Sequence, residues 1–70
     1  MKLHDLKTVV INHIAFTYFY TREKNDIHGN PRFRVYIMDP DGAAVYEKIL
    51  KIYEGLIPEA VKRFLEETQQ

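Results

Sequence analysis

Residues 8–22 read TVVINHIAFTYFYTR, and nearly all of them are β-branched or aromatic. Side chains of these types fit the pleated surface of a sheet, so the stretch predicts a β-strand. Residues 32–39 read RFRVYIMD and alternate, because Phe33, Val35 and Ile37 fall on one face of an extended chain. The polar residues 23–30 predict the loop between these two strands. We therefore expect an antiparallel β-hairpin.

The first of these strands carries apolar side chains on both faces, whereas a strand with one solvated face should alternate. In an unbroken strand Phe16 lies on one face and Phe19 on the other. Either a second chain covers the second face, or the strand breaks at Asn12-His13 in a two-residue turn, because Asn tolerates positive φ. In that case residues 3–11 form a further strand and the hairpin becomes a three-stranded meander.

The second half of the chain changes its hydrophobic period. Residues 39–42 read DPDG, which combines helix-capping and turn chemistry, and apolar residues then recur at steps of three and four. Gly55 is typical of a helix end, and Pro58 suits the first turn of a helix. We expect two C-terminal helices, or one bent helix, within residues 43–68.

These elements predict an α+β fold for residues 1–70 as a single domain. The expected core joins hairpin residues to apolar stripes of the helices, and its predicted members are Ile14, Phe16, Phe33, Val35, Ile37, Tyr46, Ile49, Leu50, Tyr53, Val61, Phe64 and Leu65. In such a core, Ile49→Ala is expected to cost about 2–5 kcal/mol of stability.

Composition excludes several classes of protein. Ten Lys and Arg residues balance ten Asp and Glu residues, which argues against a highly basic nucleic-acid binder. The chain has no Cys, and no apolar run approaches the roughly 20 residues that span a bilayer. The first residues, MKLHD, lack the hydrophobic region of a signal peptide, so we expect a cytoplasmic protein that does not associate with membranes.

Catalytic and metal-binding patterns are missing from the sequence. Neither Ser nor Cys is present as a nucleophile, and the glutamates of the second half follow the polar sides of the predicted helices. His4, His13 and His28 lack the spacing that brings two ligands together on a helix. We expect no enzyme activity, no cofactor and no metal.

Chain length and aromatic content favour a binding role. A core of this size rarely supplies more than about 3–5 kcal/mol, so self-association as a homodimer is expected. Six of the nine aromatic residues lie in the hairpin, and tyrosine and arginine are typical of interface centres. The predicted partner-binding residues, taken to lie on the outer hairpin face, are Tyr18, Tyr20, Arg22, Arg32, Arg34 and Tyr36. They indicate a non-enzymatic protein-binding module; the alternatives are a sheet-based binder of single-stranded nucleic acid and a small structural or assembly subunit.

Residues 28–35, HGNPRFRV, resemble the Gly-Asn-Pro-Arg-aromatic hairpin turn of small uncharacterised bacteriophage and prophage proteins. The match covers about a tenth of the chain. The resemblance implies a mobile-element origin and a host protein as partner, for example as an inhibitor of a defence system acting in the host cytoplasm.

Overall fold

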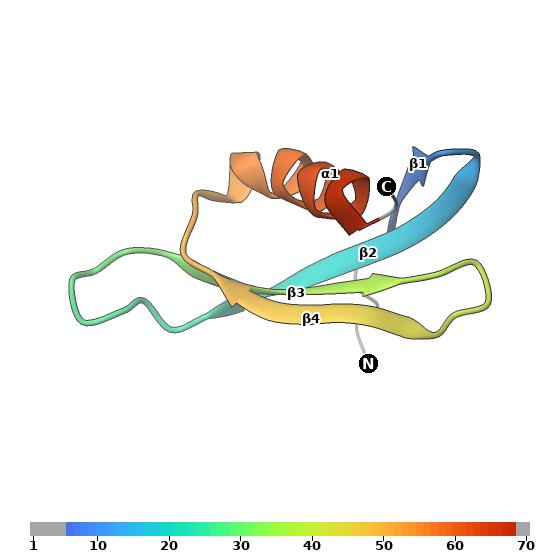
Figure 1. Cartoon of the computed structure of the whole chain (residues 1–70). Coiled ribbons are helices and arrows are strands. Elements are labelled where there is room, and N and C mark those ends of the chain that lie inside the picture. Colours follow the sequence, from blue (N-terminus) through green and yellow to red (C-terminus); the bar gives the residue numbers. More distant parts are fainter. Residues whose placement is uncertain (1–5, 69–70) are drawn as a thin grey trace.

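The computed structural model describes residues 6–68, which form a four-stranded antiparallel sheet followed by a helix (Figure 1). The strands lie in the sheet in chain order, so each pairs with the strand that precedes it. The elements are β1 (Lys7–Ile11), β2 (Ile14–Glu23), β3 (Arg32–Met38), β4 (Ala44–Leu50), the 3-10 turn η1 (Glu54–Leu56) and α1 (Ile57–Thr68).

The strand breaks at Asn12-His13, which is the second of the two alternatives that the sequence left open. Both residues have positive φ, 51° and 67°, as a two-residue hairpin turn of the primed type requires. β1 then pairs with β2 so that Val9 lies opposite Phe16. Residues 3–5 of the expected first strand lie outside the described residues.

The prediction of two helices, or one bent helix, over residues 43–68 is wrong, because Ala44–Leu50 is the strand β4. The sheet therefore has one strand more than the predicted meander, and among residues 6–68 the helical part consists of η1 and α1. The general α+β character of the fold is unaffected.

Asp39 closes the hairpin turn that residues 39–43 form between β3 and β4. Its side-chain Oδ1 accepts hydrogen bonds from the backbone N–H groups of Asp41 and Ala43, at 3.0 and 2.9 Å. Its own backbone N–H donates to the carbonyl of Ala43 at 2.9 Å. Gly42 adopts a φ of 85°, which glycine reaches without the steric cost of a side chain. The chain thus reverses and returns beside β3.

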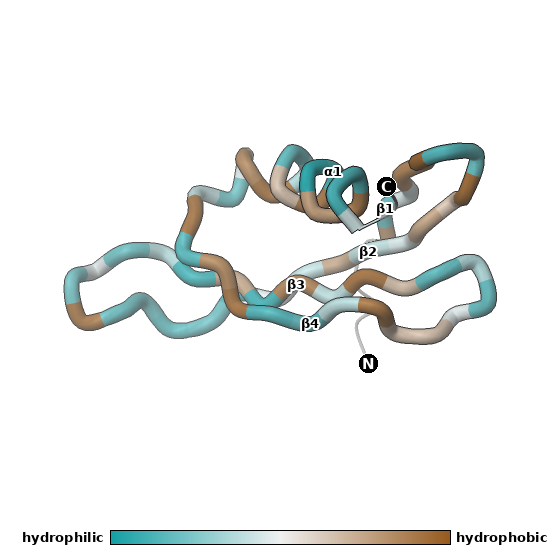
Figure 2. Tube along the Cα trace, in the orientation of Figure 1, coloured by the Kyte–Doolittle hydropathy of each residue, from teal (hydrophilic) through white to brown (hydrophobic). Residues whose placement is uncertain are grey.

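α1 covers one face of the sheet, and the hydrophobic core lies between them (Figure 1). The helix contributes residues one turn apart, and the sheet contributes alternate residues of its strands. Figure 2 shows that the loop between β2 and β3, by contrast, is mostly hydrophilic. The buried core residues are Ile11, Phe16, Tyr18, Phe33, Val35, Ile37, Ile57, Val61 and Leu65.

Three members of the predicted core are exposed. Ile14, Ile49 and Tyr53 have 36%, 38% and 73% of their surface in solvent. Ile49 is exposed because a strand turns alternate residues to opposite faces, so Ile49 and its neighbour Leu50 cannot both face α1. Within residues 6–68, no helix has the length and apolar character needed to cross a membrane.

Candidate protein interface on the open face of the sheet

The structure does not bring the six predicted partner-binding residues together. In the pairing of β2 with β3, Tyr20 lies opposite Val35 and Thr21 lies opposite Arg34. Directly paired residues of antiparallel strands share one face. The face towards α1 therefore holds Tyr18, Tyr20 and Arg22, while the opposite face holds Arg32, Arg34 and Tyr36.

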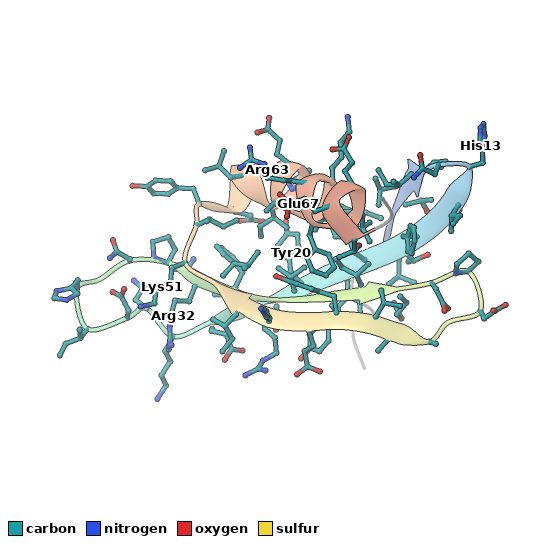
Figure 3. The ribbon with its side chains drawn as sticks, in the orientation of Figure 1. His13, Tyr20, Arg32, Lys51, Arg63 and Glu67 are labelled. Atoms are coloured by element: carbon teal, nitrogen blue, oxygen red, sulfur yellow. The ribbon has the colours of Figure 1, made fainter. Side chains whose placement is uncertain are left out.

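The two tyrosines of β2 belong to the interior side of the sheet. Tyr18 is 5% exposed, and burial raises the pKa of its phenol because the charged form is poorly solvated there. The hydroxyl of Tyr20, which is labelled in Figure 3, donates a 2.7 Å hydrogen bond to Glu54 Oε2. The Tyr20 ring meets Phe33 edge to face, with centroids 5.6 Å apart. Both residues hold the helical segment against the sheet.

The arginines at the ends of β2 and β3 fasten the loop between these strands. Arg22 donates to Asn25 Oδ1 at 2.8 Å, and its guanidinium lies 5.4 Å from the centre of the Phe33 ring. The Nε–H of Arg32 donates to the backbone carbonyl of Lys24 at 2.7 Å. Their side chains are thus engaged within the chain.

The face of the sheet opposite α1, here called the open face, has an aromatic pair at its centre. Phe19 and Tyr36 lie opposite each other on β2 and β3, with ring centroids 4.7 Å apart and planes inclined by 14°. This offset stacking is a favourable arrangement for two aromatic rings. Strand register places the following residues on the open face: Thr8, Val10, Ala15, Thr17, Phe19, Thr21, Glu23, Arg32, Arg34, Tyr36, Met38, Ala44, Glu47 and Ile49.

Three of the four charged groups on the open face are paired with each other. Arg34 lies 3.1 Å from Glu47 and 3.7 Å from Glu23, so it bridges β2 and β4 across β3. Desolvation lowers the pKa of Arg34, but the attraction of Glu23 and the hydrogen bond to Glu47 outweigh it and raise the pKa overall. With Arg32 included, two basic and two acidic residues leave this face electrically neutral.

Sequence reasoning identified Arg32, Arg34 and Tyr36 but missed Phe19, Met38 and Ile49 on the same face. The sequence did contain a signal for Phe19, because residues 14–20 carry apolar side chains on both faces of the strand. The missing information was the register, which decides which face α1 covers.

The described residues contain no cluster of three or more His, Asp or Glu side chains arranged to hold a metal ion. No protein-family model, no curated protein and no solved structure matches the chain.

Proposed function

We propose that this chain is a non-enzymatic protein-binding module that forms a homodimer, with a second copy covering the open face. The observation that carries the proposal is the stacked Phe19–Tyr36 pair at the centre of a sheet face that no element of residues 6–68 covers. An antiparallel sheet with one solvated face is expected to place polar residues there. Phe19, Tyr36, Met38 and Ile49 depart from that pattern.

Charge supports a second copy as the occupant. The open face is electrically neutral and carries both signs, so two copies related by a two-fold axis meet without net repulsion. A single-stranded nucleic acid, the alternative that an aromatic sheet face suggests, needs a positive groove for its phosphates. Here Arg34 is already neutralised by two carboxylates.

The area of the open face predicts a dimer of modest affinity. Four strands of five to ten residues, about 4.8 Å apart and rising about 3.4 Å per residue, span roughly 450 Å². Two such faces bury roughly 900 Å², which is close to the lower limit of about 1,000 Å² for specific interfaces. We therefore expect dissociation in the micromolar range.

Sedimentation equilibrium tests the proposal, with protein concentrations from about 1 µM to about 1 mM. Wild-type protein is expected to change from monomer to dimer over this range, and Phe19→Glu is expected to remain monomeric because a carboxylate cannot be buried between two sheets. Ile49→Lys provides a second disruption of the same face. Tyr53→Glu is the matched control, since Tyr53 is 73% exposed and lies outside the open face.

Circular dichroism establishes that each variant is folded before it is compared. A wild-type protein that stays monomeric at the highest concentration overturns the proposal. Salt-sensitive binding of oligothymidylate, lost in the Phe19→Glu variant, would instead assign the open face to nucleic acid. Because residues 28–35 resemble a turn of small bacteriophage proteins, we also propose a host protein as a further partner.

A further inference from the structure

The outer edge of β1 carries backbone hydrogen-bonding groups that no strand of residues 6–68 pairs with. β1 is the first strand in the sheet order, so β2 is its one neighbouring strand in this part of the chain. The two-residue turn after β1 makes Ile11 and Ile14 the hydrogen-bonded pair that closes the hairpin. Bonded and non-bonded pairs alternate along antiparallel strands, so the N–H and C=O groups of Thr8 and Val10 point away from β2.

β1 also lacks the features that protect the edges of natural sheets. Charged side chains and bulges are the usual protection, because an open edge is a template for another strand. The opposite edge strand, β4, has both: Glu47 and Lys48 occupy its middle, and its register against β3 shifts between Ile37 and Met38. Residues 8–11 of β1 read TVVI, without a charge, and their pairing with β2 is regular. β1 is therefore the edge that is open to a further strand.

The surroundings of the β1 edge favour an extended segment with aliphatic side chains. Val10 exposes 62% of its surface, and Leu6, directly before β1, exposes 63%. β1 lies beside the C-terminal part of α1 (Figure 1). A groove of about 370 Å³ lies between them and is lined by Val10, Ile11, Asn12, Lys62 and Glu66. One base and one acid balance each other in this groove, so charge does not select the partner.

We propose that the outer edge of β1 binds an extended segment of another protein, which adds to the four-stranded sheet as a fifth, antiparallel strand beside α1. Donors and acceptors that alternate along an edge are complementary to an extended polypeptide, and strand addition is a recurrent mode of peptide recognition. A nucleic acid presents no such row of backbone donors and acceptors. Aliphatic side chains of the segment are expected to cover Val10 and Leu6.

A second copy of β1 is a less suitable occupant of the same edge. Two β1 strands related by a two-fold axis pair about a residue near the middle of the strand. The groove lies at one end of β1, beside residues 10–12, where a segment without this symmetry can extend along it. The hydrogen-bonding groups of the edge lie in the plane of the sheet, so the stacking of two open faces does not use them.

Amide hydrogen exchange and fluorescence anisotropy test the proposal. The probe is a labelled peptide of alternating threonine and valine, closed by a lysine at each end. In the free protein the Val9 amide is expected to exchange slowly, because it bonds to β2, and the Thr8 and Val10 amides are expected to exchange fast. Peptide binding is expected to slow the exchange of Thr8 and Val10 and to leave that of Val9 unchanged.

Substitutions on the edge strand test the contact itself. Val10→Lys is expected to weaken peptide binding at least about fivefold, because a lysine on an edge opposes pairing. Val45→Lys is the matched control, since Val45 is a 45% exposed valine of β4.

Thr8→Pro removes one outward N–H, and proline is tolerated where the N–H of an edge strand faces solvent. It is expected to weaken binding by a similar factor, whereas Thr8→Val, which keeps the N–H, is expected to bind like the wild type. Circular dichroism establishes that each variant is folded, and Val10→Lys, at an exposed position, tests the edge even where Thr8→Pro unfolds the chain.

Further measurements separate the possible occupants and the proposed dimer. Phe19→Glu is expected to bind the peptide like the wild type, so loss of the dimer and loss of peptide binding are distinguishable. A peptide with every backbone nitrogen methylated is expected not to bind. The proposal is overturned if the unmodified peptide does not bind at millimolar concentration, if the methylated peptide binds equally well, or if Val45→Lys is as damaging as Val10→Lys. Dimerisation of Phe19→Glu that Val10→Lys abolishes would overturn it in favour of a second copy.

Discussion

At the scale of single residues, Ile37 and Ile49 show how strand register sets the environment of chemically identical side chains. Ile37 is fully buried on β3 beneath α1, while Ile49 on β4 faces the other way and is 38% exposed. Burying a whole isoleucine side chain contributes about 1.5–3 kcal/mol, and its removal also leaves a cavity. Ile37 therefore contributes more than Ile49 to the free energy of unfolding of the monomer.

Truncation of each isoleucine tests this difference. Ile37→Ala is expected to lower the free energy of unfolding by about 2–5 kcal/mol, and Ile49→Ala by less than about 1 kcal/mol, because the latter leaves no closed cavity. Urea denaturation at a protein concentration below the dimer's dissociation constant measures both values. Equal losses would place Ile49 in the core of the monomer and contradict the assignment of faces. A core position for Ile49 is what the three- and four-residue spacing of apolar side chains in residues 46–53 had predicted.

At the scale of elements, the sequence indicates β1, β2, β3 and α1 but misassigns β4. The run AVYEKIL spaces Tyr46, Ile49 and Leu50 as a helix does, and seven residues are too few to exclude that period. Asp39 accepts backbone hydrogen bonds in the observed turn just as it would at a helix N-terminus. What decides the outcome is pairing with β3, and that contact between distant residues is invisible to local patterns.

The candidate site was predictable only in part, for the same reason. Alternation places Arg34 and Tyr36 on the face opposite Val35. It cannot place β2 relative to β3, because a shift of one residue moves every side chain of β2 to the other face. The observed register sets Phe19, and not Tyr18 or Tyr20, beside Tyr36.

The loop between β2 and β3 provides a pH-dependent prediction at this scale. Hydrogen bonds lower the pKa of the Asp26 carboxyl group below the ordinary 3.8. The N–H of Asn30 has the largest effect, and the Asn30 side chain and the N–H of His28 add to it. The carboxylate's stabilising effect on the loop is therefore complete above pH 3.8 and is lost as the pH falls through the lower pKa of the folded protein.

Amide chemical shifts of residues 28–30, followed during acidification of a His28→Gln variant that removes the neighbouring imidazole, measure this transition. They are expected to stay constant from neutral pH to about pH 4 and to change below it. Asp26→Ala is expected to abolish the transition, whereas Asp41→Ala, in the other long turn, is expected to preserve it. Shifts that change already near pH 5 would show that Asp26 is not held as a carboxylate by these donors.

At the scale of the whole molecule, the protein is a thin object of two layers. Its principal extents are 39, 32 and 17 Å, and the shortest of them accommodates one sheet and one helix. Within residues 6–68, a single helix of 12 residues covers one face of the four-stranded sheet, and no element of that range covers the other face. Stability then depends strongly on the few large side chains packed beneath α1, of which the buried Tyr18 and the half-buried Tyr46 can ionise.

These two tyrosines make the fold sensitive to alkali. Tyr18 is buried in the core, and the ring of Tyr46 packs against Phe64 with centroids 4.1 Å apart. Burial raises the pKa of both phenols above the ordinary 10.0, because the tyrosinate is poorly solvated there. Stability linked to these groups is therefore fully present below pH 10.0, and it is lost as the pH rises through the raised pKa values of the folded protein.

Tyrosinate absorbance and far-ultraviolet circular dichroism, recorded on the same alkaline titration, test this linkage. Tyr18 and Tyr46 are expected to ionise above pH 10.0, together with loss of the sheet signal. Tyr18→Phe is expected to shift the alkaline unfolding midpoint to higher pH, since phenylalanine fills most of the same space without an ionisable group. Tyr53→Phe, at a position 73% exposed, is expected to leave the midpoint unchanged. Ionisation of all five tyrosines near pH 10 with the fold intact would contradict the burial of Tyr18, and with it the position of α1 on that face of the sheet.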